Sequence, residues 1–170
     1  MRRPGSRDDE AGFVDFMAAR SGQLYRSAYL LTTSEPAAED LLQTALAKAY
    51  AAWPRVRKAD DPVAYVHGIL IKTFLSDRRH RSSTELPVAE PGDDTSTDQD
   101  PTDRLALMSA LAQLSTTDRA VVVLRFWEDR SVAQTAQDLG LTQAAVKNRS
   151  LRALRELRLL LDTPIPNGLP

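Results

Sequence analysis

Residues 131–158 read SVAQTAQDLGLTQAAVKNRSLRALRELR, and this stretch decides how the C-terminal part of the chain folds. Ser131 followed by Gln134 forms a capping box, which predicts the start of a helix. The next positions recur at helical spacing and predict one buried stripe: Val132, Thr135, Ala136 and Leu139. Gly140 suits the left-handed conformation that ends a helix, Leu141 can fill the turn, and Thr142 can cap a second helix. The stretch therefore predicts a helix, a tight turn and another helix.

The second helix of this motif has two different faces when its residues are placed about 100° apart. The apolar arc carries Val146, Ser150, Leu154, Leu157 and Leu161. The opposite arc carries Asn148, Arg149, Arg152 and Arg155, with Lys147 and Arg158 at its border. An Arg-rich helix taken alone is often only a solvated surface. Because a capped helix and a Gly-Leu-Thr turn precede this one, we expect its basic arc to enter a DNA major groove.

Composition narrows the class of protein. The chain has 170 residues, of which 42% are hydrophobic, enough for one ordinary domain or two small helical ones. It has no cysteine, so disulfides and Cys-ligated zinc are excluded. The sequence contains no run of about 18 apolar residues, so no membrane-spanning helix is predicted. The basic N-terminal residues MRRPGSRDDE are not followed by an apolar run, so a secretory signal peptide is not predicted either. We expect a cytoplasmic protein without a membrane partner.

Charge is unevenly distributed along the chain, although the net charge is only −1. Residues 85–103 hold seven acidic and no basic side chains, and they are rich in Pro, Ser and Thr. Such a segment cannot bury enough apolar surface to offset its ordering entropy, so it is predicted to be a flexible linker. We expect a disordered arm over residues 1–12, two domains over residues 13–84 and 104–162, and a short tail over residues 163–170.

Both predicted domains are helical, which makes the expected fold class all-α. Ser34-Glu35-Pro36 predicts a helix from Pro36 to Trp53, closed by Pro54. Asp60-Asp61-Pro62 predicts another, which has a basic end and which Gly68 weakens by about 1 kcal/mol relative to alanine, enough to permit a small break. The run AVVVLRFW (residues 120–127) would favour a strand by its β-branched residues alone, but the chain offers no partner strand. We predict a helix there, started by Ser115 and Asp118.

Two segments, AEDLLQTALAKAYAAW (38–53) and residues 114–158, together resemble the bacterial extracytoplasmic-function sigma factors of the sigma-70 superfamily. These are promoter-recognition subunits of RNA polymerase. The resemblance implies that the first domain corresponds to sigma region 2, which binds core polymerase and melts the minus-ten element. It implies that the second corresponds to sigma region 4, which reads the minus-thirty-five element, and that an anti-sigma factor is a further partner.

The resemblance assigns roles to three sets of residues. The predicted polymerase-binding residues are Asp40, Gln43, Thr44 and Ala47, where Thr44 replaces the acidic residue common in the family. The residues predicted to contact the minus-ten region are Tyr65, Lys72, Arg78, Arg79 and Arg81, with Phe74 as a second aromatic candidate. Lys72 stands where relatives often carry Asn. The residues predicted to read the upstream duplex are Thr142, Gln143, Lys147, Asn148, Arg149, Arg152 and Arg155.

Enzyme chemistry finds no support in the sequence. His67 and His80 are the only imidazoles and belong to no metal-binding spacing, and no Gly-rich phosphate loop is present. We therefore predict no catalytic residues, no metal site and no cofactor. Two alternatives remain open: a stand-alone helix-turn-helix regulator that binds DNA without polymerase, and an adaptor that uses the same helices only for protein partners.

Overall fold

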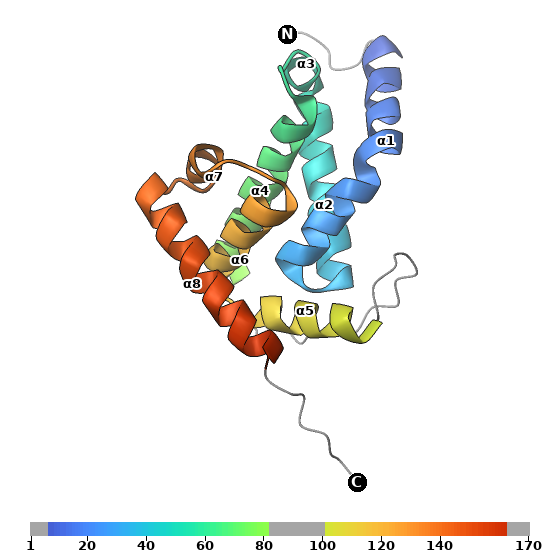
Figure 1. The fold of residues 1–170 in the computed structure, drawn as a ribbon. Helices are drawn as coiled ribbons and strands as arrows, with labels where there is room; N and C mark the ends of the chain where they lie inside the picture. Colours follow the sequence, from blue (N-terminus) through green and yellow to red (C-terminus); the bar gives the residue numbers. More distant parts are fainter. Residues whose placement is uncertain (1–6, 82–100, 163–170) are drawn as a thin grey trace. The chain divides into compact units, whose positions relative to one another are not determined.

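The computed structural model describes residues 7–81 and 101–162, and the described residues form helices without any strand. The chain divides into two compact units between Leu86 and Pro87, within the segment expected to be the linker. Figure 1 labels the helices of both units along the chain. The predicted all-α fold of two small domains is confirmed. The expected tail and residues 85–100 of the expected linker lie outside the described residues.

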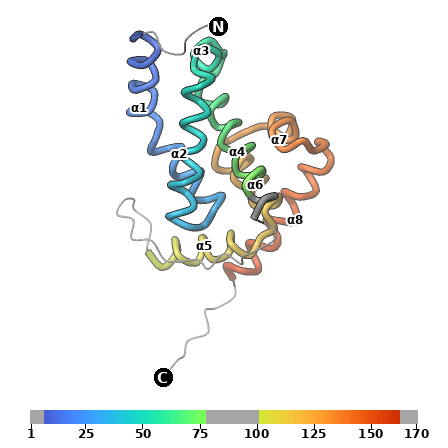
Figure 2. Tube along the Cα trace, turned by 180° about the vertical axis from the view of Figure 1, so that it is seen from behind, coloured from blue at the N-terminus to red at the C-terminus, as the bar shows by residue number. Residues whose placement is uncertain are grey.

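The N-terminal unit contains four helices. They are α1 (Arg7–Thr32), α2 (Glu35–Ala51), the single turn α3 (Trp53–Val56) and α4 (Pro62–Arg81). The three long helices lie side by side, with α2 packed against both α1 and α4 in both ribbon and tube views (Figure 2). Each of the three therefore buries one stripe of its surface in a shared core.

Local signals start the helices of this unit where the sequence indicates. Ser34 caps α2 by accepting a hydrogen bond from Ala37 N, with Pro36 in the first turn. Asp61 Oδ1 accepts a hydrogen bond of 3.0 Å from Ala64 N at the start of α4. The predicted end of α2 was wrong: the helix stops at Ala51, and Pro54 lies in the first turn of α3, where its missing N–H costs nothing. Gly68 does not break α4, which is one continuous helix from Pro62 to Arg81.

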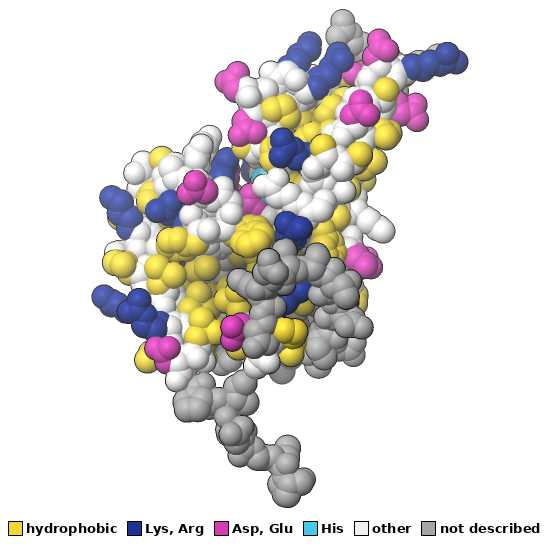
Figure 3. Space-filling model, turned by 45° about the vertical axis from the view of Figure 1, so that its right-hand side comes forward, with side chains coloured by type: hydrophobic (Ala, Val, Ile, Leu, Met, Phe, Trp, Pro, Cys, Tyr) yellow, Lys and Arg dark blue, Asp and Glu magenta, His cyan; other side chains and the backbone are white. Residues whose placement is uncertain are grey.

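Helix α1 starts six residues earlier than the predicted domain boundary. Residues 7–12, expected to belong to a disordered arm, are helical, and residues 1–6 lie outside the described part. Asp8, Asp9 and Glu10 occupy the first turn, where carboxylates stabilise the positive end of the helix dipole. Asp9 also lies 3.0 Å from Arg57 of the α3–α4 turn. Charged side chains of both signs gather at this end of the unit (Figure 3).

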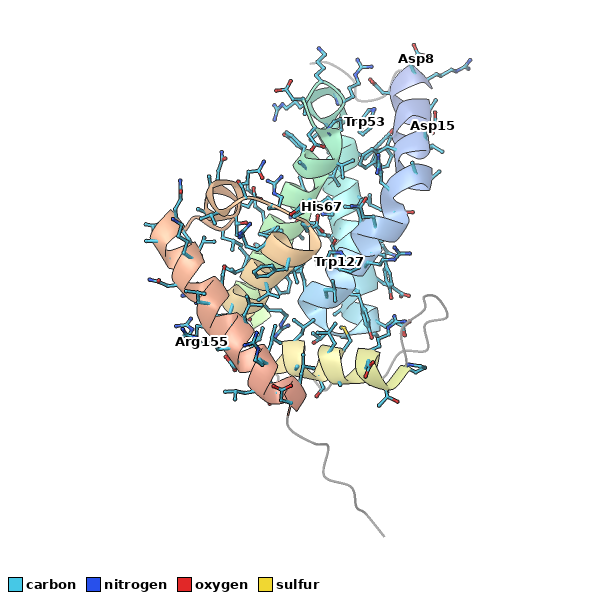
Figure 4. The ribbon with its side chains drawn as sticks, viewed as in Figure 1. Asp8, Asp15, Trp53, His67, Trp127 and Arg155 are labelled. Atoms are coloured by element: carbon cyan, nitrogen blue, oxygen red, sulfur yellow. The ribbon has the colours of Figure 1, made fainter. Side chains whose placement is uncertain are left out.

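Aromatic packing closes the same end of the core. Phe13 of α1 lies 5.5 Å from Trp53, edge to face, and 5.0 Å from Tyr50, measured between ring centroids. Trp53 is only 6% exposed, and Figure 4 shows it beside α1. Since α1 remains helical through Ser21 and Gly22, Phe13 and the later buried residues Leu24, Ala28 and Leu31 all belong to one helix.

The C-terminal unit is also helical. It contains α5 (Pro101–Gln113), α6 (Thr116–Val122), one π-helical turn η1 (Val123–Trp127), α7 (Val132–Leu139) and α8 (Gln143–Asp162). Helix α8 packs against α5, α6 and α7. Residues 101–103, expected to end the linker, form the first turn of α5 instead, with proline at its first position.

The β-branched run of the C-terminal unit is helical, as predicted. Ala120, Val121, Val122, Val123 and Leu124 are all buried and cross from α6 into η1. Burial against the neighbouring helices outweighs the weak strand propensity of valine. None of the helices in the two described ranges is long and apolar enough to cross a membrane.

Candidate nucleic-acid interface

The helix-turn-helix is built from local hydrogen bonds. Ser131 Oγ accepts from Gln134 N at 3.1 Å, and Gln134 Oε1 accepts from Ser131 N at 3.0 Å, so the predicted capping box is confirmed. Gly140 ends α7 in the left-handed conformation, with φ +65°. Leu141 N then donates to Ala136 O at 2.9 Å, and Thr142 Oγ1 accepts from Ala145 N at 3.1 Å. These bonds determine the path of the chain from α7 into α8.

Helix α8 is held on the unit by a narrow apolar stripe. Its buried residues are Val146, Ser150, Ala153 and Leu157. The predicted apolar arc was wrong at Leu154 and Leu161, which are 40% and 45% exposed, while Ala153 is fully buried. Ala153, and not its neighbour Leu154, therefore faces the helices that pack against α8.

The residues predicted to read duplex DNA are accessible on α8 and its preceding turn, with one exception. The exposed ones are Thr142, Gln143, Lys147, Asn148, Arg152 and Arg155. Arg149 is only 32% exposed in its side chain. Arg155 points away from the body of the unit, as Figure 4 shows. This surface combines cations with amide and hydroxyl groups, the chemistry that contacts phosphates and base edges.

Two arginines of α8 share one carboxylate that lies 31 and 34 residues earlier in the chain. Arg149 Nη1 donates to Asp118 Oδ1 at 2.7 Å. Arg152 Nη2 donates to both Asp118 oxygens at 3.0 Å, and Arg152 Nε donates to Oδ2 at 3.3 Å. The Asp118 side chain is 5% exposed. The sequence indicated Asp118 only as part of a helix cap, so its bonds to α8 were missed.

Asp118 takes part in the predicted helix cap through its backbone, but its side chain does not complete a capping box. Its backbone N–H donates to Ser115 Oγ at 3.2 Å, which starts α6 as expected. Its carboxylate faces the two arginines. Burial raises the pKa of the Asp118 carboxyl, but the hydrogen bonds and charges of Arg152 and Arg149 outweigh burial and hold the pKa below its ordinary value. The same hydrogen bond raises the pKa of Arg152. Asp118 and Arg152 are therefore both charged near neutral pH.

A second candidate surface lies on α2 of the N-terminal unit. The four residues predicted to bind polymerase are all exposed and lie within two turns: Asp40, Gln43, Thr44 and Ala47. The opposite side of the helix is buried through Ala38, Leu41, Ala45 and Ala49. A rigid helix thus presents a carboxylate, an amide and a hydroxyl on one face.

Helix α4 carries the residues predicted to contact the melted strand. Tyr65 is 38% exposed and Lys72, two turns later, is exposed, so both are accessible on one side of the helix. Phe74 is 3% exposed and belongs to the core, which removes it as a base-stacking candidate. The side chains of Arg78, Arg79 and Arg81 lie outside the described residues, although their backbone is helical.

The two histidines and the acidic side chains are the candidate metal ligands of this chain. His67 is 4% exposed within the N-terminal unit, and the side chain of His80 is not described. No group of three or more His, Asp or Glu side chains in the described part is placed to hold a metal ion.

Two family models match the chain in the order of its two units. Sigma-70 region 2 matches residues 16–84, and Sigma-70 region 4 matches residues 104–157. The chain is 38% identical over 150 residues to the RNA polymerase sigma-E factor of Streptomyces coelicolor, covering 86% of this chain and 84% of that protein. It is 33% identical over 147 residues to the ECF RNA polymerase sigma factor SigL of Mycobacterium tuberculosis, covering 82% of each.

Solved structures share the fold. The sigma factor RpoE of Bartonella quintana, solved with the anti-sigma factor NepR, has a TM-score of 0.75 at 24% identity, over 91% of this chain and 99% of that one. CnrH, solved with the cytosolic domain of CnrY, has a TM-score of 0.63 at 24% identity, over 92% of this chain and 91% of that one.

Proposed function

The chain belongs to the sigma-70 family of RNA polymerase sigma factors, in its extracytoplasmic-function group, and from this premise we propose how its two units direct transcription initiation. The protein joins core RNA polymerase and brings it to promoters by recognising the minus-thirty-five and minus-ten elements. Bond formation belongs to the polymerase, so this subunit acts by binding alone. It works in the cytoplasm, where the polymerase meets DNA.

The N-terminal unit binds the polymerase through the exposed face of α2. The accessible side chains of Asp40 and Gln43 support this assignment, because they stand on a helix whose other side is anchored in the core. A rigid, pre-ordered surface loses little conformational entropy when a partner binds. Tyr65 and Lys72 of α4 contact the opened strand, the first by stacking and the second through a phosphate.

The C-terminal unit reads the upstream duplex through α8. The observation that carries this proposal is a capped helix-turn-helix whose second helix exposes Lys147, Asn148, Arg152 and Arg155. This helix enters the major groove, while Thr142 and Gln143 at its N-terminus lie close to the phosphate backbone. An anti-sigma factor that covers either surface would hold the protein inactive.

Reconstituted transcription tests the proposal. The purified chain is mixed with core RNA polymerase from the same bacterium and genomic promoter fragments, and the transcripts are sequenced from their 5′ ends. We expect transcripts from a defined set of promoters only when the chain is present. A stand-alone regulator would bind duplex without polymerase and start no transcript, and a protein-only adaptor would show no sequence-dependent DNA binding.

Paired variants test the surface on α2. Asp40→Ala and Gln43→Ala should each weaken assembly with core polymerase about tenfold, the scale of a moderate interface contact. Asp15→Ala and Gln23→Ala are matched controls, because these residues are exposed on α1 of the same unit. If the α2 variants assembled as tightly as the α1 controls, the assignment of this face would be withdrawn.

A further inference from the structure

Some of the cationic side chains on the basic face of α8 are paired with a carboxylate, and others are not, among the residues that the structure describes. Lys147, Arg152 and Arg155 are exposed, yet Arg152 and the half-buried Arg149 both bind Asp118. An unpaired cation on a DNA-binding helix attracts any phosphate, whatever the base sequence. The shared carboxylate leaves this pair of arginines with one net positive charge instead of two. Asp118 therefore lowers the sequence-independent part of the attraction to DNA.

The geometry of Arg152 leaves one end of its guanidinium available. Nε and Nη2 form the edge that faces Asp118, and within the described residues Nη1 makes no hydrogen bond. The side chain remains 62% exposed although its inner edge is bound. A guanidinium has five N–H donors in a rigid plane, so donors at the outer end can still reach the paired acceptors of a guanine edge.

Asp118 is a fixed anchor for this arrangement. Its side chain is 5% exposed, its backbone N–H is held by Ser115, and its lowered pKa keeps it ionised. Immobilising a long side chain on binding normally weakens affinity by roughly two- to tenfold. Because Arg152 is already bound along one edge, part of that loss occurs on folding instead of on binding DNA.

We propose that Asp118 is a specificity-determining positioning residue, which aims the free end of Arg152 at a guanine and withholds Arg149 from the phosphates. Arg149 completes the anchor, since its Nη1 bonds to the Asp118 oxygen that Arg152 Nη2 also binds. This inference rests on the proposed reading of upstream duplex by α8.

Selection from a random duplex pool tests the inference. The full chain, assembled on core polymerase, captures duplexes that carry a fixed minus-ten region and a randomised upstream region, and the bound fraction is sequenced. Affinities are then measured for the selected duplex and a scrambled duplex over a salt series. The wild-type chain should show a G·C preference at one or more upstream positions.

Asp118→Asn keeps the shape of the side chain and removes its charge. For this variant we expect the affinity for the selected duplex, divided by the affinity for the scrambled duplex, to fall about tenfold. The variant should also lose the preference for G·C at an upstream position. Affinity for the scrambled duplex should rise at low salt, and the dependence of log K on log salt should steepen by up to about one. Asp138→Asn is the matched control, because it breaks the 2.7 Å ion pair between Asp138 of α7 and Arg130, which are in the same unit but are not part of α8.

Arg152→Lys tests the same point from the other side of the contact, because it leaves the Asp118 carboxylate and its bond to Arg149 in place. The variant keeps the charge on an exposed side chain but loses the planar fork, so it should keep scrambled-duplex affinity and lose the G·C preference. If Asp118→Asn kept the wild-type ratio within twofold, Asp118 would have only a structural role and the inference would be overturned, whatever the result for Arg152→Lys. If the wild-type assembly formed but selected no upstream sequence, the proposed reading by α8 would fail as well.

Discussion

Gly140 gives a sharp test of how the helix-turn-helix is held. It ends α7 with φ +65° and ψ 33°, and a Cβ placed on it would meet no atom within 4 Å. Gly140→Ala therefore creates no clash with neighbouring side chains, and its cost comes from the backbone alone. An L-residue in the left-handed region costs about 1–2 kcal/mol relative to glycine. For a unit of this size, 1 kcal/mol lowers the melting temperature by about 4–8 °C.

Gly22 provides a control with the opposite expected sign. It lies inside α1, and a Cβ there would also meet nothing within 4 Å. Gly22→Ala should stabilise the N-terminal unit by about 0.5–1 kcal/mol, because alanine loses less backbone entropy in a helix. Gly140→Asn should cost less than Gly140→Ala, since asparagine tolerates the left-handed region better than alanine.

Tryptophan fluorescence allows each unit to be followed separately, because Trp53 lies in the N-terminal unit and Trp127 in the C-terminal unit. Urea unfolding is measured on the full chain in a Trp53→Phe background for Gly140 variants and a Trp127→Phe background for Gly22→Ala. The reasoning would be refuted if Gly140→Ala were neutral or stabilising, or if asparagine cost as much as alanine.

Three further predictions concern the cap of α7, the acid stability of the C-terminal unit and the exposed face of α2. Ser131→Ala removes the side chain that caps α7 and should destabilise the C-terminal unit by about 1 kcal/mol in the same urea assay, with Gln134→Ala costing less. Because the folded-state pKa of Asp118 is lowered, its stabilising contribution should be present above about pH 4 and be lost as the pH falls through that lowered value. Acid titration of Asp118→Asn should lack this component, and an unchanged acid limb would contradict the ion-pair assignment. Thr44→Glu places a carboxylate on the exposed face of α2 and should tighten assembly with core polymerase several-fold in a competition assay, whereas Thr44→Ser should not.

Helix starts and ends that depend on a cap or a tight turn could be predicted from neighbouring residues. Ser34, Ser131 and Gly140 each act within four positions of themselves, through a cap or a left-handed turn. Asp61 does the same at the start of α4. Such hydrogen bonds depend on little beyond the local sequence, so the pattern of residue types was sufficient to predict them.

Helix ends that depend on packing were harder to predict. The early start of α1 at Arg7 is supported by the bond between Asp9 and Arg57, which joins residues 48 positions apart in sequence. Helix α2 stops at Ala51, and Trp53 just beyond it packs edge to face on Phe13 of α1. Neither contact leaves a periodic signal in a short window of sequence, because each joins segments that only the folded unit brings together.

The sequence by itself determined the helical class, the helix-turn-helix and the shared face of Asp40, Gln43 and Ala47 on α2, since each follows from spacing within one helix or turn. Tertiary structure alone decided which side of α8 is buried and what its arginines bind. Ala153 is buried and its neighbour Leu154 is 40% exposed, because the positions of α5, α6 and α7 around α8 decide which side of the helix is covered. Arg149 and Arg152 meet Asp118 because α6 and α8 pack together, and a carboxylate that is 5% exposed must be paired to remain charged.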